Sequence, residues 1–351
     1  MGTIMLAIKL GSSTTTIYKE SEGFLLKEPS LVAITGSVKG KEVCAVGFDA
    51  KRLQGRTGAD NVTSVVAPIY EGVITNSELA SEMLKAFIAK VCPKKLFKPT
   101  IKALVCVPLG ITLAEKVAFE KVCYSAGISN VILVPSIICS AVGKGIDISQ
   151  TTASMIVGIG GGCTDIAVVG QNMLINGVNV GMGGTNIDKA IEQQILAKFN
   201  LIIGDNTAEK IKKEIGSLYI NDTNEIEITG QDSVSKESKS IVITAVDIYP
   251  AVEHYYSKIA ESISSVLAIC PPDVVADVTR KGIVFVGGDS KIIGLEKYFK
   301  TKLNISVVGS DDADDLDVLG AAELLENGEL LKKVLINMWL LLILIKLLGK
   351  T

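Results

Sequence analysis

The sequence predicts an α/β fold in which two related domains face each other across a cleft. Apolar runs typical of strands alternate with amphipathic helix patterns along most of the chain. A strand–turn–strand unit that begins at Ile4 recurs from Met155, which indicates an internal duplication. Glycine-bearing turns follow three of the expected strands, and such turns are typical of phosphate sites.

Length and composition support a folded, multidomain protein. The chain has 351 residues, enough for two domains, and its 48% apolar and 21% charged residues exclude general disorder. A net charge of −3 offers no electrostatic reason to bind nucleic acid, so no nucleic-acid partner is expected. Seven cysteines without paired spacing favour reduced, buried thiols in a cytosolic protein. The N-terminus has no pattern of a secretory signal.

The first half of the chain is expected to begin with two strands joined by a tight turn, Ile4–Leu10 and Thr14–Tyr18. Further elements follow from periodicity: helices at Glu78–Val91 and Leu113–Ala126, and strands at Ile101–Val107 and Val131–Val134.

The second half repeats the strand pair at Met155–Ile159 and Ile166–Val169. After it we expect helices at Asn186–Phe199, Thr207–Leu218, Ala245–Ala268, Leu295–Lys302 and Leu316–Glu326, with hairpin strands at Glu225–Thr229 and Ser240–Thr244. A strand ends at Gly287-Gly288, and an acidic loop with Asp314 and Asp315 is expected to cap the last helix.

The three glycine turns are Gly11-Ser12-Ser13, Gly160-Gly161-Gly162 and Gly287-Gly288. Without a Cβ to shield them, backbone N–H groups in such turns can converge on a phosphate. One turn alone is weak evidence, but three turns in this order and spacing predict a single shared cleft.

Several longer stretches carry a family resemblance. They are Leu26–Ile34, Ala45–Gly47, Gly55–Thr57, Asp188, Phe199–Gly204, Thr207–Gly216 and Arg280–Val284 leading into Gly287-Gly288. On these residues the chain resembles the MreB family of bacterial actin-like cell-shape proteins, from about residue 4 to about residue 335.

The resemblance implies an actin-like ATPase fold: two duplicated RNase H-like domains, I and II, each with A and B subdomains, around a nucleotide cleft. Domain I is expected at 1–145 plus 311–330, with IB at about 33–70. Domain II is expected at 146–310, with IIB at about 183–243, followed by a hydrophobic tail at 331–351. The resemblance further implies ATP or ADP as ligand and head-to-tail filaments of the chain itself.

Carried over by position, one set of residues is expected to bind the nucleotide. Its members are Gly11, Ser12 and Ser13 in the first phosphate loop; Gly160, Gly161 and Gly162 in the second; Gly183 and Gly184 beside the cleft; Glu209 and Lys212 at the ribose and adenine; and Gly287 and Gly288 over the nucleoside. On spacing alone, Glu209 and Lys212 would read as an exposed helix ion pair.

Four positions depart from the family pattern. Lys9 and Gly158 stand where the family has aspartates that hold Mg²⁺, Ser136 where it has a glutamate that orients water, and Cys163 where it has a threonine. Mg²⁺ needs oxygen ligands, usually with a carboxylate or two. We therefore expect Mg²⁺ binding to be compromised and ATP hydrolysis to be strongly impaired.

Two interpretations of Lys9 follow. In one, its ammonium pairs with the β- or γ-phosphate in place of the metal, and Gly158 leaves space for it. In the other, the site has decayed, Lys9 faces solvent and no nucleotide binds.

Two segments point to an anionic membrane. Leu96 and Phe97, flanked by lysines, match a membrane loop of the family. The tail from Val334 to Leu348 is apolar nearly all round and contains Trp339. Its fifteen or so helical residues would span about 22 Å, less than the ~30 Å hydrocarbon core, which favours an interfacial anchor. The alternative is a tail that packs on its own domain or on a partner.

The leading hypothesis is a cytoskeletal filament protein on the inner face of the cell membrane, acting in cell shape or cytoskeletal support. Its ATP hydrolysis is expected to be weak or absent, and an ATPase-competent paralogue is expected to co-assemble with it. The runner-up is an active ATPase in which other residues hold the metal. A sugar kinase or chaperone relative is the third alternative, but those families lack the Leu26–Ile34 and Thr207–Gly216 patterns.

Overall fold

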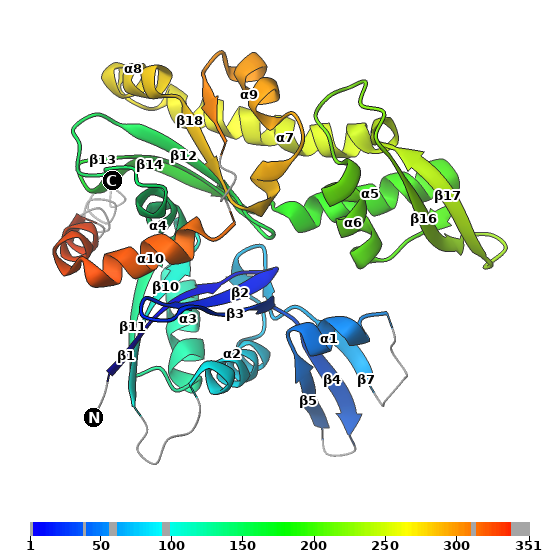
Figure 1. Ribbon diagram of the computed structural model, residues 1–351, viewed down its shortest axis with the longest axis horizontal. Helices are drawn as coiled ribbons and strands as arrows, with labels where there is room; N and C mark the ends of the chain where they lie inside the picture. Colours follow the sequence, from blue (N-terminus) through cyan, green and yellow to red (C-terminus); the bar gives the residue numbers. More distant parts are fainter. Residues whose placement is uncertain (1–2, 38–39, 56–61, 93–98, 310–313, 338–351) are drawn as a thin grey trace.

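The structure is a computed structural model of the whole chain, and it describes residues 3–37, 40–55, 62–92, 99–309 and 314–337. Figure 1 shows two halves, one above the other, that meet along helices α4 (Ser136–Gly143) and α10 (Leu316–Glu326). Each half contains one large sheet and one small sheet.

Large sheet I belongs to the N-terminal half and has the order β3-β2-β1-β10-β11. Its strands are β1 (Thr3–Leu10), β2 (Thr14–Lys19), β3 (Gly23–Pro29), β10 (Thr100–Val107) and β11 (Asn130–Pro135). The first three strands form an antiparallel meander, whereas β10 and β11 run parallel to β1.

Large sheet II repeats this plan with the order β14-β13-β12-β18-β19. Its strands are β12 (Ser154–Ile159), β13 (Thr164–Gly170), β14 (Met173–Val180), β18 (Ile283–Val286) and β19 (Val307–Val308). Again three strands form a meander and two run parallel to the first strand. Identical order and direction in both sheets confirm the duplication that the two strand pairs predict.

Helices cover both large sheets. Sheet I is flanked by α2 (Ser77–Val91) and α3 (Leu113–Ser125), and sheet II by α7 (Ala245–Ala268), α8 (Pro272–Lys281) and α9 (Leu295–Leu303) (Figure 1). Between the sheets, α4 and α10 share one apolar core with residues of both, such as Ala7 and Leu104 from sheet I and Ile156 and Ala167 from sheet II. This core joins the two halves beneath the cleft.

The crossing of α4 and α10 depends on two glycines. A Cβ on Gly320 would lie 1.8 Å from the Cys139 carbonyl oxygen, and one on Gly143 would lie 2.1 Å from the Leu316 carbonyl oxygen. Real Cβ atoms do not approach so closely, so the two backbones can meet only because these positions lack side chains.

Two smaller sheets lie at the far ends of the halves. Small sheet I has the order β5-β4-β7, with β4 (Val32–Ser37), β5 (Gly40–Val46) and β7 (Val62–Val66), and carries α1 (Phe48–Leu53). Small sheet II has the order β15-β16-β17, with β15 (Leu201–Ile202), β16 (Glu225–Asp232) and β17 (Ser238–Thr244), beside α5 (Gly184–Phe199) and α6 (Asp205–Ile215). A short pair, β8 (Ile69–Tyr70) and β9 (Val73–Ile74), precedes α2, and a 3₁₀ turn, η1 (Gly288–Lys291), follows β18.

The chain continues as a helix over 328–337 after α10. Leu331 and Val334 are buried in the core between the sheets, and the Asn337 side chain donates to the carbonyl of Asn172, 3.1 Å away, at the β13–β14 turn. The first residues of the predicted tail are thus part of the folded body. No helix in the described part of the chain is both long and apolar enough to cross a membrane.

Most of the predicted elements are present, with shifted ends. The helix predicted at Thr207–Leu218 runs over Asp205–Ile215, and that predicted at Asn186–Phe199 begins at Gly184. Asp315 stands at the N-cap of α10, but its side chain makes no capping hydrogen bond, so that detail of the prediction is wrong. All seven cysteines are free thiols, as expected, but only Cys106, Cys123 and Cys139 are buried. Cys44 is exposed, and the other three are half-buried.

Candidate nucleotide cleft

The first glycine turn connects β1 and β2. The Gly11 N–H donates to the Thr14 carbonyl at 3.2 Å and closes the turn. Ser30, after β3, supports it from below: its hydroxyl donates to the Gly11 carbonyl at 2.6 Å, and its N–H donates to the Ser13 carbonyl at 3.0 Å. The backbone carbonyls of the turn are thereby fixed by a neighbouring strand end.

The second turn connects β12 and β13 and closes in the same way, since the Gly160 N–H donates to the Cys163 carbonyl at 3.0 Å. The N-terminus of α5 supports this turn. The Gly184 N–H donates to the Gly160 carbonyl at 2.9 Å, and the Thr185 N–H donates to the Gly161 carbonyl at 2.8 Å. A Cβ on Gly183 would lie 2.4 Å from the Gly161 carbonyl carbon, so the close approach of helix and turn requires glycine there.

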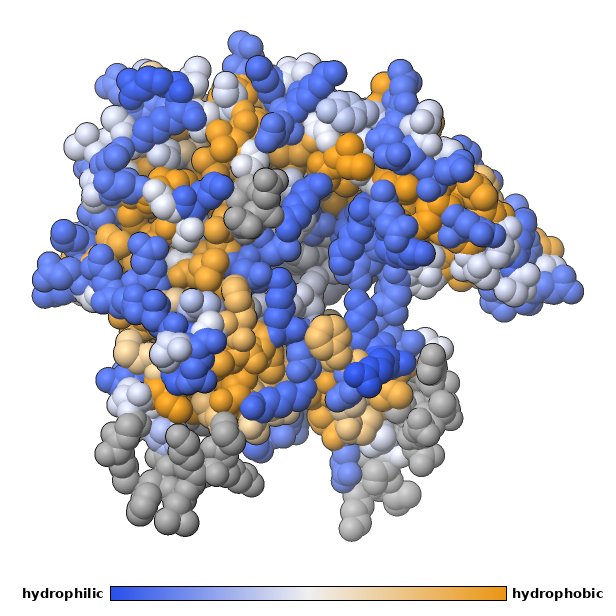
Figure 2. Space-filling view, in the orientation of Figure 1, coloured by the Kyte–Doolittle hydropathy of each residue, from blue (hydrophilic) through white to orange (hydrophobic). Residues whose placement is uncertain are grey.

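The turns of the two halves face each other. A Cβ on Gly161 would lie 2.0 Å from the Ser13 Oγ, and one on Gly162 would lie 2.2 Å from the Ser12 Oγ. The third turn adjoins the second, because a Cβ on Gly287, at φ +90°, would lie 2.3 Å from the Ile159 carbonyl oxygen. The structure therefore brings all three turns together at one cleft, and Figure 2 shows mainly hydrophilic residues around the recess between the halves.

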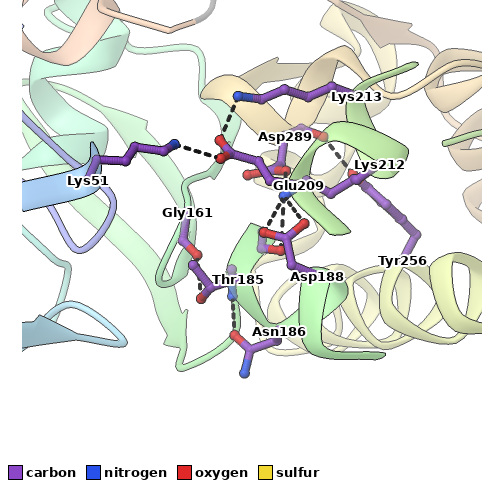
Figure 3. A network of polar contacts seen from close by, with 12 residues as sticks. Lys51, Gly161, Thr185, Asn186, Asp188, Glu209, Lys212, Lys213, Tyr256 and Asp289 are labelled. Atoms are coloured by element: carbon purple, nitrogen blue, oxygen red, sulfur yellow. Dashed lines mark hydrogen bonds and ion pairs between the residues drawn. The ribbon is translucent and has the colours of Figure 1, made fainter. Parts of the chain in front are cut away.

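Lys212, in the α6 helix, is buried and lies beside Gly184 (Figure 3). Its ammonium is 2.8 Å from the Asp289 carboxylate and 3.0 Å from the Asp188 carboxylate, and it donates to the Gly184 carbonyl at 2.9 Å. Burial acts to lower the pKa of Lys212, but the two carboxylates outweigh burial and raise it. Burial raises the pKa of Asp188 to about 6, although Lys212 acts in the opposite direction.

Glu209, one turn earlier in α6, lies at the mouth of the cleft. Its carboxylate accepts from the Lys213 ammonium at 2.6 Å and from the Lys51 ammonium at 2.9 Å. Burial acts to raise the pKa of Glu209, yet these two hydrogen bonds hold it at about 2. Glu209 and Lys212 are thus not paired with each other, and the simple ion-pair interpretation of their spacing is wrong.

Lys9 points from β1 toward α10. Its ammonium is 2.8 Å from the buried Asp317 carboxylate and 3.3 Å from the Asp314 carbonyl, and its side chain is 24% exposed. Burial acts to lower the pKa of Lys9, but Asp317 raises it above the ordinary value. An ammonium has three N–H donors, and two have partners here.

A family model described as MreB/Mbl protein matches residues 3–333. The chain belongs to the MreB/Mbl family. It is 34% identical over 324 residues to the cell shape-determining protein MreB of Escherichia coli K12, covering 92% of this chain and 93% of that protein. It is also 32% identical over 330 residues to Mbl of Bacillus subtilis, covering 93% and 97%. The sugar kinase or chaperone alternative is thereby excluded.

Solved structures agree with the MreB/Mbl assignment. MreB 5 of Spiroplasma citri bound to AMPPNP matches with a TM-score of 0.86 and 27% identity, covering 94% of this chain and 98% of that one. The MamK double helical filament matches with a TM-score of 0.77 and 22% identity, over 93% and 99% of the chains, which shows a shared fold. The protein is thus an actin-like cytoskeletal protein of the MreB type.

Two of the positions expected to depart from the family pattern, Lys9 and Gly158, have different surroundings from those expected. A Cβ on Gly158 would lie 3.1 Å from the Ile137 Cδ1 and 3.5 Å from the Val286 Cγ2, so Gly158 makes room for apolar side chains and not for Lys9. Lys9 does not point toward Gly158, and it is not simply turned to solvent. Its ammonium is bound by Asp317.

The other two positions are Ser136, outside the glycine turns, and Cys163, at the end of the second turn. Ser136 is the first residue of α4, directly after β11. Burial and the nearby Asp165 charge raise the pKa of the Cys163 thiol to about 12. Because Mg²⁺ prefers oxygen ligands, a thiol at this position does not replace a threonine hydroxyl.

Sequence reasoning missed Asp165, which is 5% exposed on β13. Its carboxylate accepts from the Leu109 N–H at 3.1 Å and from the Asn179 side chain at 2.6 Å, and it links sheet II to the loop after β10. Burial raises its pKa to about 6 despite both hydrogen bonds. A single charge within an otherwise apolar strand next to the triple glycine is the signal that identifies it.

Ser30, Lys51 and Asp317 were missed as well, for a different reason. Each is far in sequence from the residue that it holds, namely Gly11, Glu209 and Lys9. Ser30 and Asp317 are polar residues buried at 0% and 6% exposure, which only the folded structure reveals.

Proposed function

We propose that this MreB-type protein binds ATP or ADP in the cleft, assembles into filaments on the inner face of the cell membrane, and hydrolyses ATP weakly or not at all. The convergence of the three glycine turns carries the proposal. Filaments of this kind would act in cell shape or in cytoskeletal support.

The cleft residues fit a nucleotide. Without a Cβ to shield them, backbone N–H groups in glycine turns can approach phosphate oxygens. Those of Gly11 and Gly160 are excepted, because they close their own turns. Gly11, Ser12 and Ser13 would contact the phosphates from one side, and Gly160, Gly161 and Gly162 from the other, with Gly183 and Gly184 behind them. Glu209 and Lys212 would contact the nucleoside, and Gly287 and Gly288 would cover it. Relatives solved with AMPPNP and with ADP, at 27% and 28% identity, support this assignment.

Lys9 would supply positive charge to the phosphates. Among the described residues, two of its three donors have partners, Asp317 and the Asp314 carbonyl, which leaves the third for a phosphate oxygen near the end of β1. Neither interpretation of Lys9 included Asp317 as its counter-ion. The proposal keeps the first interpretation in one respect, because the ammonium would still meet a phosphate oxygen.

Mg²⁺ does not fit the site in the way that the family pattern implies. The two aspartate positions hold Lys9 and Gly158, and no group of three carboxylate, histidine or cysteine side chains in the described ranges is arranged to bind a metal ion. An ammonium at the first position would repel a divalent cation. We therefore derive no hydrolytic step through Mg²⁺, and Ser136 and Cys163 have no catalytic role in the proposal.

Self-association is the expected mode of assembly, because a related actin-like chain, MamK, was solved as a double helical filament. A subunit with impaired hydrolysis would turn over slowly. We infer that an ATPase-competent paralogue of the same family supplies turnover by co-assembly.

Membrane attachment rests on sequence. Leu96, Phe97 and Trp339 lie outside the described residues. The helix over 328–337 already contains the first residues of the apolar segment, and Val334 among them is buried in the folded body. Two weak apolar contacts per subunit would be multiplied along a filament, which makes peripheral binding to an anionic leaflet effective.

Phosphate release and electron microscopy test the proposal together. With Mg²⁺ and ATP, we expect release at least about a hundredfold slower than from Escherichia coli MreB, because several groups that stabilise phosphoryl transfer are missing. Filaments are expected with nucleotide on vesicles that contain phosphatidylglycerol. Release at the rate of that relative would favour the alternative of a rearranged metal site, and monomers under all conditions would refute the filament proposal.

A further inference from the structure

The two small sheets are bridged across the mouth of the cleft. On one side, Lys51 lies in α1 and Gln54 is the C-cap residue after that helix. On the other side, α6 contains Asp205 and Glu209. The Lys51 ammonium donates to the Glu209 carboxylate at 2.9 Å, and the Gln54 amide donates to the Asp205 carboxylate at 2.9 Å. Lys51 and Gln54 are about one helical turn apart, and so are Asp205 and Glu209, so the two contacts lie side by side across the mouth.

A second set of contacts crosses the same gap nearer the turns. The Lys189 ammonium donates to the Tyr70 hydroxyl at 2.9 Å and lies 4.6 Å from the centre of its ring. The Asn186 amide donates to the Glu71 carboxylate at 3.3 Å. The segment around β8 and helix α1 therefore both bind to the opposite half of the molecule.

We propose that Lys51 is a positioning residue of the nucleotide site: it orients the Glu209 carboxylate and, together with Gln54, keeps the mouth of the cleft closed. The nucleotide part of this inference rests on the proposed function, because Glu209 is the residue assigned there to the nucleoside. Opening of the mouth to exchange a bound nucleotide then requires the Lys51–Glu209 and Gln54–Asp205 contacts to break, together with those of Tyr70 and Glu71.

Figure 3 shows the geometry that distinguishes Lys51 from its neighbours. Two lysines bind the Glu209 carboxylate, but Lys213 is on the same helix, four residues away, whereas Lys51 comes from the other half of the chain. Of these two contacts to Glu209, only the one from Lys51 is lost when the halves separate. Lys51 and Glu209 are each about one-third exposed, 36% and 33%, so water can compete for the bond and the closure is reversible.

This difference provides a matched pair of variants. Lys51→Ala removes the ion pair with Glu209 across the cleft. Lys213→Ala removes the ion pair with the same carboxylate within α6. Lys51→Arg retains a cation that can reach Glu209 and is expected to restore the behaviour of the parent protein.

The first measurement needs no nucleotide. Spin labels attached through non-natural amino acids at two exposed positions, Arg52 on α1 and Val234 at the β16–β17 turn, report the separation of the small sheets by pulsed electron paramagnetic resonance. Lys51→Ala is expected to lengthen and broaden the distance distribution. Lys213→Ala and Lys51→Arg are expected to leave it unchanged. Identical distributions for Lys51→Ala and Lys213→Ala would overturn the proposal.

The second measurement follows release of a fluorescent ATP analogue after mixing with excess ATP. Release from Lys51→Ala is expected to be about threefold to tenfold faster than from Lys213→Ala. The reason is that loss of the partly exposed Lys51–Glu209 ion pair also weakens the neighbouring Gln54–Asp205 contact. Equal release rates would overturn the role in the nucleotide site. If no variant or parent binds the analogue while the distances still change, the proposed nucleotide function fails and the closure itself stands.

Discussion

Lys9 and Asp317 form a pair of charges at the base of the cleft, linking the first strand to the last long helix. The Asp317 side chain is 8% exposed, so its carboxylate depends on Lys9 for compensation. Removing one member of a buried pair leaves an uncompensated charge, which costs far more than the pair itself contributes. Asp315 and Lys27, close by, form a pair that is more exposed.

We therefore predict that Asp317→Asn lowers the free energy of unfolding by about 2–4 kcal/mol. The matched variant Asp315→Asn is expected to cost less than about 1 kcal/mol, because exposed pairs contribute little. Urea denaturation at pH 7 measures both. Replacing both members of the buried pair, Lys9→Met with Asp317→Leu, should recover most of the loss. Equal effects of Asp317→Asn and Asp315→Asn would contradict the account of Lys9.

Asp165 predicts how stability changes with pH. Burial raises the pKa of its carboxyl to about 6 in the folded protein, whereas an unfolded aspartate titrates near about 4. Between these values the folded state binds more protons, so stability decreases as the pH rises from about 4 to about 6 and is level above that range. Asp188, with a pKa of about 6, adds a change of the same sign.

Asp165→Asn should remove the Asp165 part of that decrease. An asparagine oxygen can accept from both the Leu109 N–H and Asn179 without a buried charge, so we expect the variant to be more stable at pH 8 by about 1–3 kcal/mol and nearly unchanged at pH 4. Thermal and urea unfolding over pH 4–8 would show this. A variant less stable than the parent at pH 8 would mean that the ionised carboxylate is required.

At the scale of elements, the crossing of α4 and α10 determines how the halves are joined. Gly320→Ala would force a Cβ to within 1.8 Å of the Cys139 carbonyl oxygen, so the helices must move apart. Overpacking of this kind is expected to cost about 1–3 kcal/mol in unfolding free energy. Gly328→Ala is the control, because its Cβ would meet nothing within 4 Å. Equal melting temperatures for the two variants would contradict the close crossing.

The elements differ in how well the sequence predicts them. The α7 helix was predicted with its observed ends, and the β16–β17 hairpin was predicted with slightly shorter strands, because amphipathic periodicity and alternation are strong in exposed elements. In contrast, α4 was missed because six of its eight residues are buried between two sheets, and it has no polar face to reveal a helical period. The α8 helix was missed because Pro271-Pro272 reads as a stop, although proline also suits the first turn of a helix.

At the scale of the whole molecule, the duplicated sheets and the converging turns could be predicted, since glycine turns leave a local signature and the family resemblance covers the chain. The bonds that hold the site could not, because they join residues distant in sequence, as Lys51 and Glu209 do across the cleft. The domain limits 1–145 with 311–330, and 146–310, stay a prediction. The helix over 328–337 shows that the folded body extends beyond residue 330.

The proposed function requires that the cleft binds nucleotide with Lys9 and Gly158 at the positions expected to hold metal ligands. Calorimetric titration of the purified protein with ATP, with Mg²⁺ and with EDTA, tests this requirement. We predict saturable binding in both conditions, with affinities within about threefold of each other, because Lys9 and the backbone donors, and not Mg²⁺, meet the phosphates. Absence of binding in both conditions, or binding that requires Mg²⁺, would contradict the claim.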